Sequence, residues 1–152
     1  MHMANHDGLT GLANRTRFVG RVDRALADPT TTSALLFIDL DHFKIVNDHL
    51  GHAYGDIVLQ AVCKRIEAAI RPTDLAGRLG GDEIAVFCPK VASARLVSVR
   101  AALRRASLLL RTSPDVDIVT STRQREELAC PAAQRLRRTL GRRVRMCGLH
   151  LR

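Results

Sequence analysis

The sequence contains no tryptophan, and no aromatic residue of any kind follows Phe87 in this chain of 152 residues. No apolar run approaches the roughly 20 residues that a membrane-spanning helix needs. The polar start, Met1 to Asp7, lacks the apolar core of a signal peptide. None of the four cysteines forms a Cys-x-x-Cys pair, which argues against a structural zinc site. These absences predict a cytoplasmic protein without a membrane segment, whose thiols are reduced.

Lysine is missing after Lys90, and the charge changes at the same place. Residues 1–90 carry 10 Lys or Arg and 11 Asp or Glu, a net charge of −1. Residues 91–152 carry 14 Arg and 4 Asp or Glu, a net charge of +10. Such a basic segment can attract nucleic-acid phosphates, but base stacking is not supported where aromatic residues are missing. We therefore do not expect nucleic acid as a partner, and we interpret the tail as solvated or poorly folded.

Length and hydrophobic periodicity indicate one α/β domain. Asn14 can cap a helix from Arg15 to about Ala27, whose buried side holds Phe18, Val22 and Leu26. The patterns that follow predict, in order, a buried strand over Ala34–Ile38, a short helix over Phe43–Leu50, a helix over Asp56–Ile70, two strands around Gly80-Gly81, a helix over about Ala92–Leu110 and a strand over Asp117–Thr120. Beyond Ser121 we predict no element. This order predicts an α/β sandwich with a largely antiparallel sheet.

Two glycines and two carboxylates stand together between two apolar runs, at Gly80-Gly81-Asp82-Glu83. Glycine reaches positive φ without a Cβ penalty, so Gly80 and Gly81 favour a tight hairpin turn. Two adjacent acids at an exposed hairpin tip contribute nothing to a core. Asp82 and Glu83 are instead well placed to hold a divalent metal against phosphates.

Another carboxylate follows the first predicted strand. Asp39 lies at the carboxyl end of Ala34–Ile38, where α/β folds commonly place their sites. If the fold brings Asp39 and Asp82 together, their hard oxygen atoms could coordinate Mg²⁺. The alternative is that Asp39 and Asp41 cap the next helix.

The segment from Asn47 to Asp56 has side chains that can read a guanine. An amide meets O6 or N7 of that base, and a carboxylate accepts from N1–H and the 2-amino group. Caps and turns around two glycines are the alternative interpretation of the same residues. His49 and His52 in this segment fit a surface or capping role better than a metal site, because no matching ligand spacing accompanies them.

Four segments together resemble the GGDEF family, the diguanylate cyclases. They are Asp7-x-Leu9-Thr10-Gly11-Leu12-x-Asn14-Arg15, Phe37-Ile38-Asp39-Leu40-Asp41-x-Phe43-Lys44, Asn47-Asp48-x-x-Gly51-His52-x-x-Gly55-Asp56 and Arg78-x-Gly80-Gly81-Asp82-Glu83. The resemblance covers about Ala4 to Pro89, with Ile84 where the family has Phe. It implies a GGDEF-type (nucleotide-cyclase or ferredoxin-like) α/β sandwich with a mainly antiparallel central sheet and flanking helices.

The resemblance also implies a reaction, the condensation of two GTP into cyclic di-GMP with loss of pyrophosphate, for bacterial signal transduction. By similarity, Asp39 and Asp82 would bind two Mg²⁺ or Mn²⁺ per GTP site, helped by the Leu40 carbonyl. Glu83 would assist metal binding or deprotonate the attacking 3′-hydroxyl. Asp82, Glu83 and Lys44 are the catalytic residues that the resemblance implies.

The implied substrate contacts lie between the strand end and the following helices. Asn47 and Asp56 would read guanine. Lys44 and nearby backbone amides, in the segment that includes His42 and Phe43, would hold phosphates. Each of two domains would hold one GTP, so turnover would need a homodimer with its two sites face to face.

Arg71 and Asp74, which precede the predicted hairpin, suggest a site for inhibition by the product. The family's product-inhibition site is an Arg-x-x-Asp at this position, which Arg71 and Asp74 match. An Arg can clamp phosphate or guanine, and an Asp can accept from guanine N–H groups. The alternative is a helix end with a local ion pair. A sensor domain is typical of relatives, and we expect the module that pairs two such domains to lie outside this sequence.

The family pattern disappears after Val91. The family's later Lys-bearing helix is absent, so we divide the chain into a GGDEF-type domain over 1–120, with an incomplete or divergent carboxyl-terminal part, and an Arg-rich divergent or disordered tail over 121–152. A shift of reading frame after Pro89, a truncation and genuine divergence all fit this change. Three functions therefore stay open: an active cyclase, a catalytically impaired receptor for cyclic di-GMP or GTP, and a basic nucleic-acid-binding protein.

Overall fold

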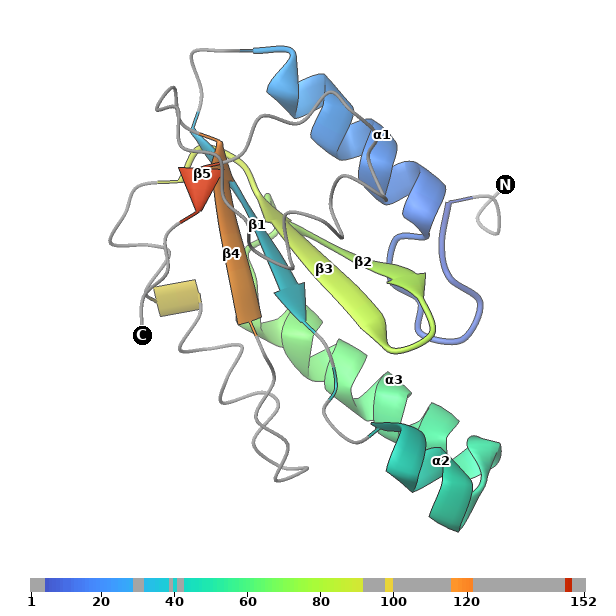
Figure 1. Cartoon of the computed structure of the whole chain (residues 1–152). Helices are drawn as coiled ribbons and strands as arrows, with labels where there is room; N and C mark the ends of the chain where they lie inside the picture. Colours follow the sequence, from blue (N-terminus) through green and yellow to red (C-terminus); the bar gives the residue numbers. More distant parts are fainter. Residues whose placement is uncertain are drawn as a thin grey trace.

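The computed structural model describes residues 5–28, 32–38, 40, 43–91, 98–99, 116–121 and 147–148. The helices within these residues are α1 (Arg15–Leu26), α2 (Phe43–Leu50) and α3 (His52–Ala69). The strands are β1 (Ser33–Ile38), β2 (Leu75–Gly80), β3 (Glu83–Cys88), β4 (Val116–Ser121) and β5 (Cys147–Gly148). They form one sheet in the order β2-β3-β1-β4-β5, and all its paired strands are antiparallel (Figure 1). The predicted α/β sandwich with an antiparallel sheet is confirmed.

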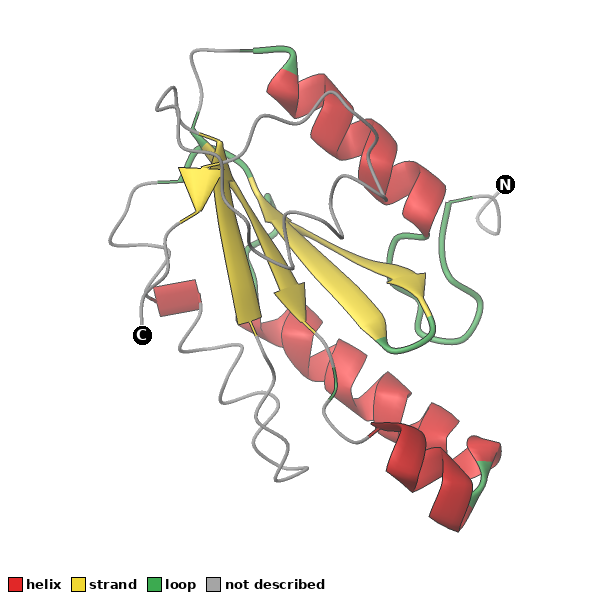
Figure 2. Ribbon diagram, viewed as in Figure 1, coloured by secondary structure: helices red, strands yellow, loops and turns green. Residues whose placement is uncertain are grey.

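Helices cover the sheet on two sides, with α1 on one face and α3 on the other (Figure 2). β1 and β3 run through the middle of the sheet, and successive side chains of a strand point to opposite faces. Alternate residues of the two strands therefore enter two different cores. The core on the α1 face contains Phe18, Val22, Leu35, Phe37, Leu79, Ala85 and Phe87. The core on the α3 face includes Leu36, Ile38, Leu59, Val62, Ile66, Ile84 and Val86.

The amino-terminal helix begins and packs as predicted. The Asn14 side chain accepts a hydrogen bond of 3.0 Å from the backbone N–H of Arg17, which satisfies a donor of the first turn. Phe18 and Val22 are fully buried against the sheet. A Cβ atom on Gly77 would lie 2.5 Å from the Phe18 ring, so the close approach of α1 to β2 requires glycine at position 77.

The loop before α1 extends the sheet at its β2 edge. The backbone N–H of Ala13 donates to the carbonyl of Ala76 at 3.1 Å, and the N–H of Arg78 donates to the carbonyl of Ala13 at 2.9 Å. Ala13 thus forms a parallel bridge with Gly77. The amino-terminal loop and the β2–β3 hairpin, far apart in the sequence, lie side by side.

The second and third helices form a tight helical hairpin through Gly51. α3 starts at His52, four residues before the predicted start at Asp56. The carbonyl of Gly51 accepts from the N–H groups of Tyr54 and Gly55, so helical bonding begins directly after the turn. Gly51 has φ 83° and ψ 158°, a conformation that is essentially restricted to glycine.

The carboxyl-terminal third is described only in part. β4 confirms the strand predicted over Asp117–Thr120. β5 pairs with β4 through Val119 and Thr120. It lies beyond Ser121, where no element was predicted, because a strand of two residues is too short to leave a periodic pattern. The helix predicted over about Ala92–Leu110 falls outside the described residues, except for 98–99. Within the described residues, no helix has the length and apolarity that crossing a membrane requires.

Candidate active site

The turn between β2 and β3 holds the two predicted acidic residues. Gly80 pairs with Glu83, so Gly81 and Asp82 form the turn, with φ 153° at Gly80 and 53° at Gly81. Both values lie in the region that favours glycine. Asp82 is half-buried and Glu83 is exposed. The expected tight glycine turn with two acids at its tip is therefore present.

The end of β1 lies beside this turn. Ile38, the last residue of β1, pairs with Ile84, the second residue of β3. Asp39 follows Ile38 in the chain but lies outside the described residues, as does His42. Leu40 is described, and its side chain is buried in the core on the α3 face. Its carbonyl accepts a hydrogen bond of 3.1 Å from the N–H of Phe43, where α2 begins.

The donor atoms at the turn suit a hard divalent cation. The side chains of Asp82 and Glu83 have no hydrogen bond or ion pair to another described residue. Carboxylate oxygens are the ligands that Mg²⁺ and Mn²⁺ take. The described residues contain no group of three or more His, Cys, Asp or Glu side chains that could hold a metal. The predicted set is completed by Asp39, which is not among them.

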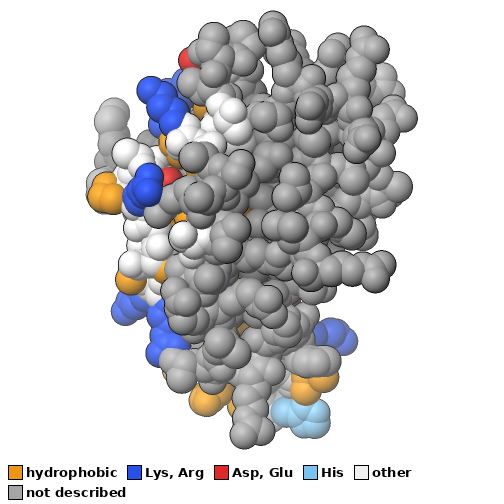
Figure 3. Space-filling model, turned by 90° about the vertical axis from the view of Figure 1, so that its left-hand side faces the viewer, with side chains coloured by type: hydrophobic (Ala, Val, Ile, Leu, Met, Phe, Trp, Pro, Cys, Tyr) orange, Lys and Arg blue, Asp and Glu red, His pale blue; other side chains and the backbone are white. Residues whose placement is uncertain are grey.

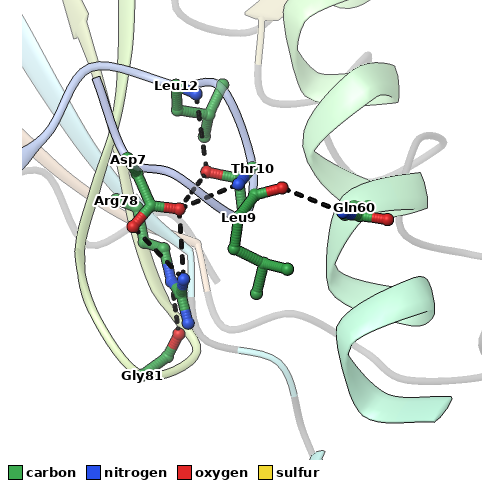
Figure 4. A network of polar contacts seen from close by, with 7 residues as sticks. All are labelled: Asp7, Leu9, Thr10, Leu12, Gln60, Arg78 and Gly81. Carbon is green, nitrogen blue, oxygen red and sulfur yellow. Dashed lines mark hydrogen bonds and ion pairs between the residues drawn. The ribbon is translucent and has the colours of Figure 1, made fainter. Parts of the chain in front are cut away.

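A polar network ties this turn to the amino-terminal loop (Figure 4). The Asp7 carboxylate accepts from the backbone N–H of Thr10 at 2.9 Å, from its hydroxyl at 2.7 Å and from Arg78 Nη1 at 3.1 Å. Arg78 Nε donates to the carbonyl of Gly81 at 2.8 Å. The amino-terminal loop is also bonded to α3, because Gln60 Nε2 donates to the carbonyl of Leu9 at 3.0 Å. One guanidinium group therefore fastens the turn next to Asp82.

The network also sets the charge state of Asp7. Burial alone would raise the pKa of this carboxyl, but the hydrogen bonds from Thr10 and the neighbouring Arg78 outweigh burial and hold the pKa below its usual range. Asp7 therefore stays ionised at neutral pH and keeps its ion pair. Sequence analysis missed this network. Asp7 and Arg78 both belong to recognised segments, yet a contact between residues 71 positions apart leaves no signal in one sequence.

The predicted phosphate and guanine ligands lie on the helical hairpin α2–α3. Lys44 is exposed and forms an ion pair of 3.6 Å with Asp48, one turn further along α2. Such an exposed pair contributes about 0–1 kcal/mol, so Lys44 is readily available to another anion. Asn47 is half-buried between the two helices, and Asp56 is exposed on α3.

The surface around these ligands is apolar in part. Figure 3 shows hydrophobic and histidine side chains at the lower end of the molecule, where α2 and the start of α3 lie in Figure 1. The exposed large hydrophobic residues of these helices are Ile45, Leu50, Tyr54 and Ile57.

The predicted inhibitory pair closes a tight turn. The N–H of Asp74 donates to the carbonyl of Arg71 at 3.0 Å, and the N–H of Arg71 donates to the Asp74 carboxylate at 3.0 Å. Asp74 is only 9% exposed, whereas Arg71 is exposed. The Asp74 carboxylate thus accepts from a backbone amide of its own turn. Arg71 therefore stands on a turn that two hydrogen bonds close.

The sequence profile described as "Diguanylate cyclase, GGDEF domain" matches residues 4–140, so the family match extends beyond Pro89, where the expected resemblance ends. The chain is 52% identical over 95 residues to diguanylate cyclase TpbB of Pseudomonas aeruginosa, a match that covers 60% of this chain and 22% of that protein. It is also 44% identical over 88 residues to NbdA of P. aeruginosa, named a cyclic di-GMP phosphodiesterase, with 56% and 11% covered. The chain thus spans about a fifth or less of these relatives.

Solved structures resemble the fold. The GGDEF domain of TpbB has a TM-score of 0.65 at 39% identity and covers 76% of this chain and 73% of that one. The coiled coil and GGDEF domain of DgcB from Caulobacter crescentus, in complex with c-di-GMP, has a TM-score of 0.72 at 29% identity, with 80% and 71% covered. The antiparallel sheet between helices agrees with the GGDEF fold of these structures. The chain belongs to the GGDEF family.

Proposed function

We propose that this chain is a diguanylate cyclase domain that condenses two GTP into cyclic di-GMP and releases two pyrophosphates. The observation that carries the proposal is the pairing of Ile38 with Ile84, because it brings the acidic turn beside the end of β1. The helical hairpin with Asn47 and Asp56 follows directly from that strand end. Metal, phosphate and guanine ligands would then converge on one end of the sheet.

In the proposed reaction, the 3′-oxygen of each GTP attacks the α-phosphorus of the other. The bond from that phosphorus to the bridging oxygen of pyrophosphate breaks, and the 3′-proton passes to a base, for which we propose Glu83. Lys44 would hold phosphate, together with backbone amides in the segment of His42 and Phe43. Two domains, each with one GTP, would have to meet face to face, since positioning of the two reactants supplies much of the rate.

We assign the metal ligands to Asp39, Asp82, Glu83 and the Leu40 carbonyl, for two Mg²⁺ or Mn²⁺ per GTP. The carboxylates of Asp82 and Glu83, which are unpaired among the described residues, support this assignment. The Leu40 carbonyl already accepts from Phe43 but keeps a second lone pair. When bound, the metals would stabilise the charge that develops at the α-phosphate.

Several wider expectations stay predictions. They are a cytoplasmic location, a homodimer, an upstream sensor domain, and the division into a domain over 1–120 and an Arg-rich tail over 121–152. The tail, and with it the nucleic-acid alternative, lies almost entirely outside the described residues.

A receptor for cyclic di-GMP is the second candidate function. The exposed Arg71 on its closed turn favours it, since a guanidinium group can clamp a phosphate of the dinucleotide. The chain is similar both to a named cyclase and to a named phosphodiesterase, so the family alone does not choose between synthesis and binding.

Incubation of the purified chain with GTP and Mg²⁺, with cyclic di-GMP and pyrophosphate quantified, tests the proposal. Asp82→Ala should lower product formation about 100-fold or more, because loss of even an outer-shell partner of a metal costs about 10- to 100-fold. Asp23→Asn is the matched control, since it changes an exposed carboxylate on α1, and it should leave the rate unchanged.

Absence of product from the unaltered chain, or equal product from Asp82→Ala, would contradict the cyclase proposal. Cyclic di-GMP binding would then be measured by titration calorimetry. Binding that Arg71→Ala abolishes, without any turnover of GTP, would support the receptor instead.

A further inference from the structure

Gly55 lies where a side chain would collide with Asn47. A Cβ atom built on Gly55 would overlap with Asn47 Oδ1, and it would lie 3.0 Å from Asn47 Cγ and 3.3 Å from Phe43 Cζ. Real Cβ atoms essentially never approach other heavy atoms as closely as the amide oxygen would require. The half-buried amide of Asn47 therefore rests directly on the bare Cα of Gly55.

The turn between the helices produces this contact. The N–H of Gly51 donates to the carbonyl of Asn47 at 2.9 Å, and the N–H of Gly55 donates to the carbonyl of Gly51 at 3.2 Å. These bonds lead the chain from the last turn of α2 into the first turn of α3. Gly55 is thereby brought under the Asn47 side chain, and it is buried there.

Phe43 prevents a methyl group at position 55 from avoiding Asn47. Phe43 borders the same space and packs against the core on the α3 face, so its ring has little freedom to withdraw. Asn47 would have to adopt another rotamer. Helices allow few rotamers at χ1, and each places the amide at a different point.

We infer that Gly55 is a positioning residue, which fixes the Asn47 amide for reading guanine. The amide oxygen faces Gly55, while Nδ2 is farther from that position than Oδ1 and Cγ. The amino group is the end that can donate to O6 or N7 of guanine. The inference rests on the proposed function, in which Asn47 reads the base, and deepens it by naming the residue that selects the rotamer.

Helix propensity alone predicts that Gly55→Ala would stabilise the protein, whereas the contact with Asn47 predicts a harmful effect. Gly55 has no positive φ, and alanine is about 1 kcal/mol more favourable than glycine inside a helix. If Gly55 had no special contact, Gly55→Ala would be harmless or stabilising. Gly20 in α1 is the matched control, because its Cβ would meet no described atom within 4 Å.

Binding of GTP and ATP to four chains tests the inference: the unaltered chain, G55A, N47A and the double variant. G55A and N47A should each weaken GTP binding about tenfold, the worth of one hydrogen bond, and leave the weak binding of ATP unchanged. G55A should add nothing in the N47A background. G20A should bind GTP like the unaltered chain.

A spectroscopic readout that needs no nucleotide separates this inference from the proposed function. The side-chain NH₂ signal of Asn47 in an amide correlation spectrum, assigned by its loss in N47A, should move in G55A and stay in place in G20A. If N47A binds GTP normally, guanine reading by Asn47 fails, whereas a moved NH₂ signal still shows the steric contact.

Three results would overturn the inference. One is an unmoved Asn47 signal in G55A, and another is unchanged GTP affinity in G55A when N47A weakens binding. The third is equal loss of GTP and ATP binding that persists in the N47A background. If G55A fails to fold, the double variant decides whether a clash with Asn47 is the cause. A double variant that folds and binds GTP as N47A does supports that clash. A double variant that also fails to fold would mean that Gly55 serves helix packing alone, which overturns the inference.

Discussion

The β2–β3 hairpin is fastened on both of its faces, whereas the α2–α3 helical hairpin meets the rest of the protein mainly through α3. Gly77 of β2 packs against Phe18, and Arg78 is bonded to Asp7. By contrast, α2 contains no buried residue, and it extends beyond the ends of the strands in Figure 1. Two of the proposed metal ligands, Asp82 and Glu83, therefore stand on a well-fastened unit, and the proposed base reader Asn47 stands on a unit with few buried contacts.

Local stability follows buried contacts, so the two units should open at different free energies. The comparison suggests a division of labour within the proposed site. We expect the acidic turn to keep its geometry without a nucleotide, because Gly77 and Arg78 fasten its strand. The helical hairpin can adjust to the base, within the limit that Gly55 sets on Asn47.

The largest effect is expected from Gly77→Ala. Its methyl group would lie 2.5 to 2.9 Å from three atoms of Phe18, and overpacking of a core costs about 1–3 kcal/mol. We expect a loss near the upper end, about 3 kcal/mol, in the free energy of unfolding by urea. Gly20→Ala, with open space in α1, is the control and should be neutral or stabilising. An undiminished stability of the Gly77 variant would show that α1 does not fasten the hairpin.

Arg78→Ala should come next. It removes the partner of a carboxylate that is three-quarters buried, and hydrogen bonds to charged groups contribute about 1.5–3 kcal/mol. We expect about 2 kcal/mol less stability at pH 7. Arg78→Lys keeps the charge but lacks the fork that serves both Asp7 and Gly81, so it should recover only part of the loss.

The acid dependence of the same variant checks its cause. The pKa of Asp7 is lowered in the folded chain, so its contribution is present above the unfolded value of about 3.9 and is lost as pH falls through the folded pKa. The stability difference between Arg78→Ala and the unaltered chain should therefore shrink below about pH 4. A difference that stays constant down to pH 2 would mean that the ion pair with Asp7 is not its source.

The smallest effect is expected on the other unit. Ile45 in α2 is 50% exposed, so Ile45→Ser should change the free energy of unfolding by no more than about 0.5 kcal/mol. Hydrogen exchange of the backbone amides should show α2 opening at lower free energy than β3. Equal protection of the two, or a loss above about 1.5 kcal/mol for the variant, would contradict the contrast between the hairpins.

The features that the sequence predicted correctly depend on local patterns. The Asn14 cap, the stripe of Phe18 and Val22, the buried strand β1 and the glycine turn each depend on neighbours a few positions apart. For that reason one sequence sufficed to predict them. The fold class followed from the order of these elements.

The missed features depend on contacts that only the folded chain creates. The start of α3 depends on the backbone geometry of Gly51, and the bond from Arg78 to Asp7 joins residues 71 positions apart. The collision that reserves position 55 for glycine exists only once α2 folds back on α3. Asp39 remains a sequence prediction, because its placement is not described.

The bridge at Ala13 has a consequence for self-association. β2 is the outermost strand on its side of the sheet, and an exposed edge invites strand addition by another chain. Ala13 occupies the carbonyl of Ala76 and the N–H of Arg78 along that edge. The loop that fastens the hairpin therefore also blocks part of a surface on which a second sheet could grow, and detaching it would expose the protein to edge-to-edge aggregation.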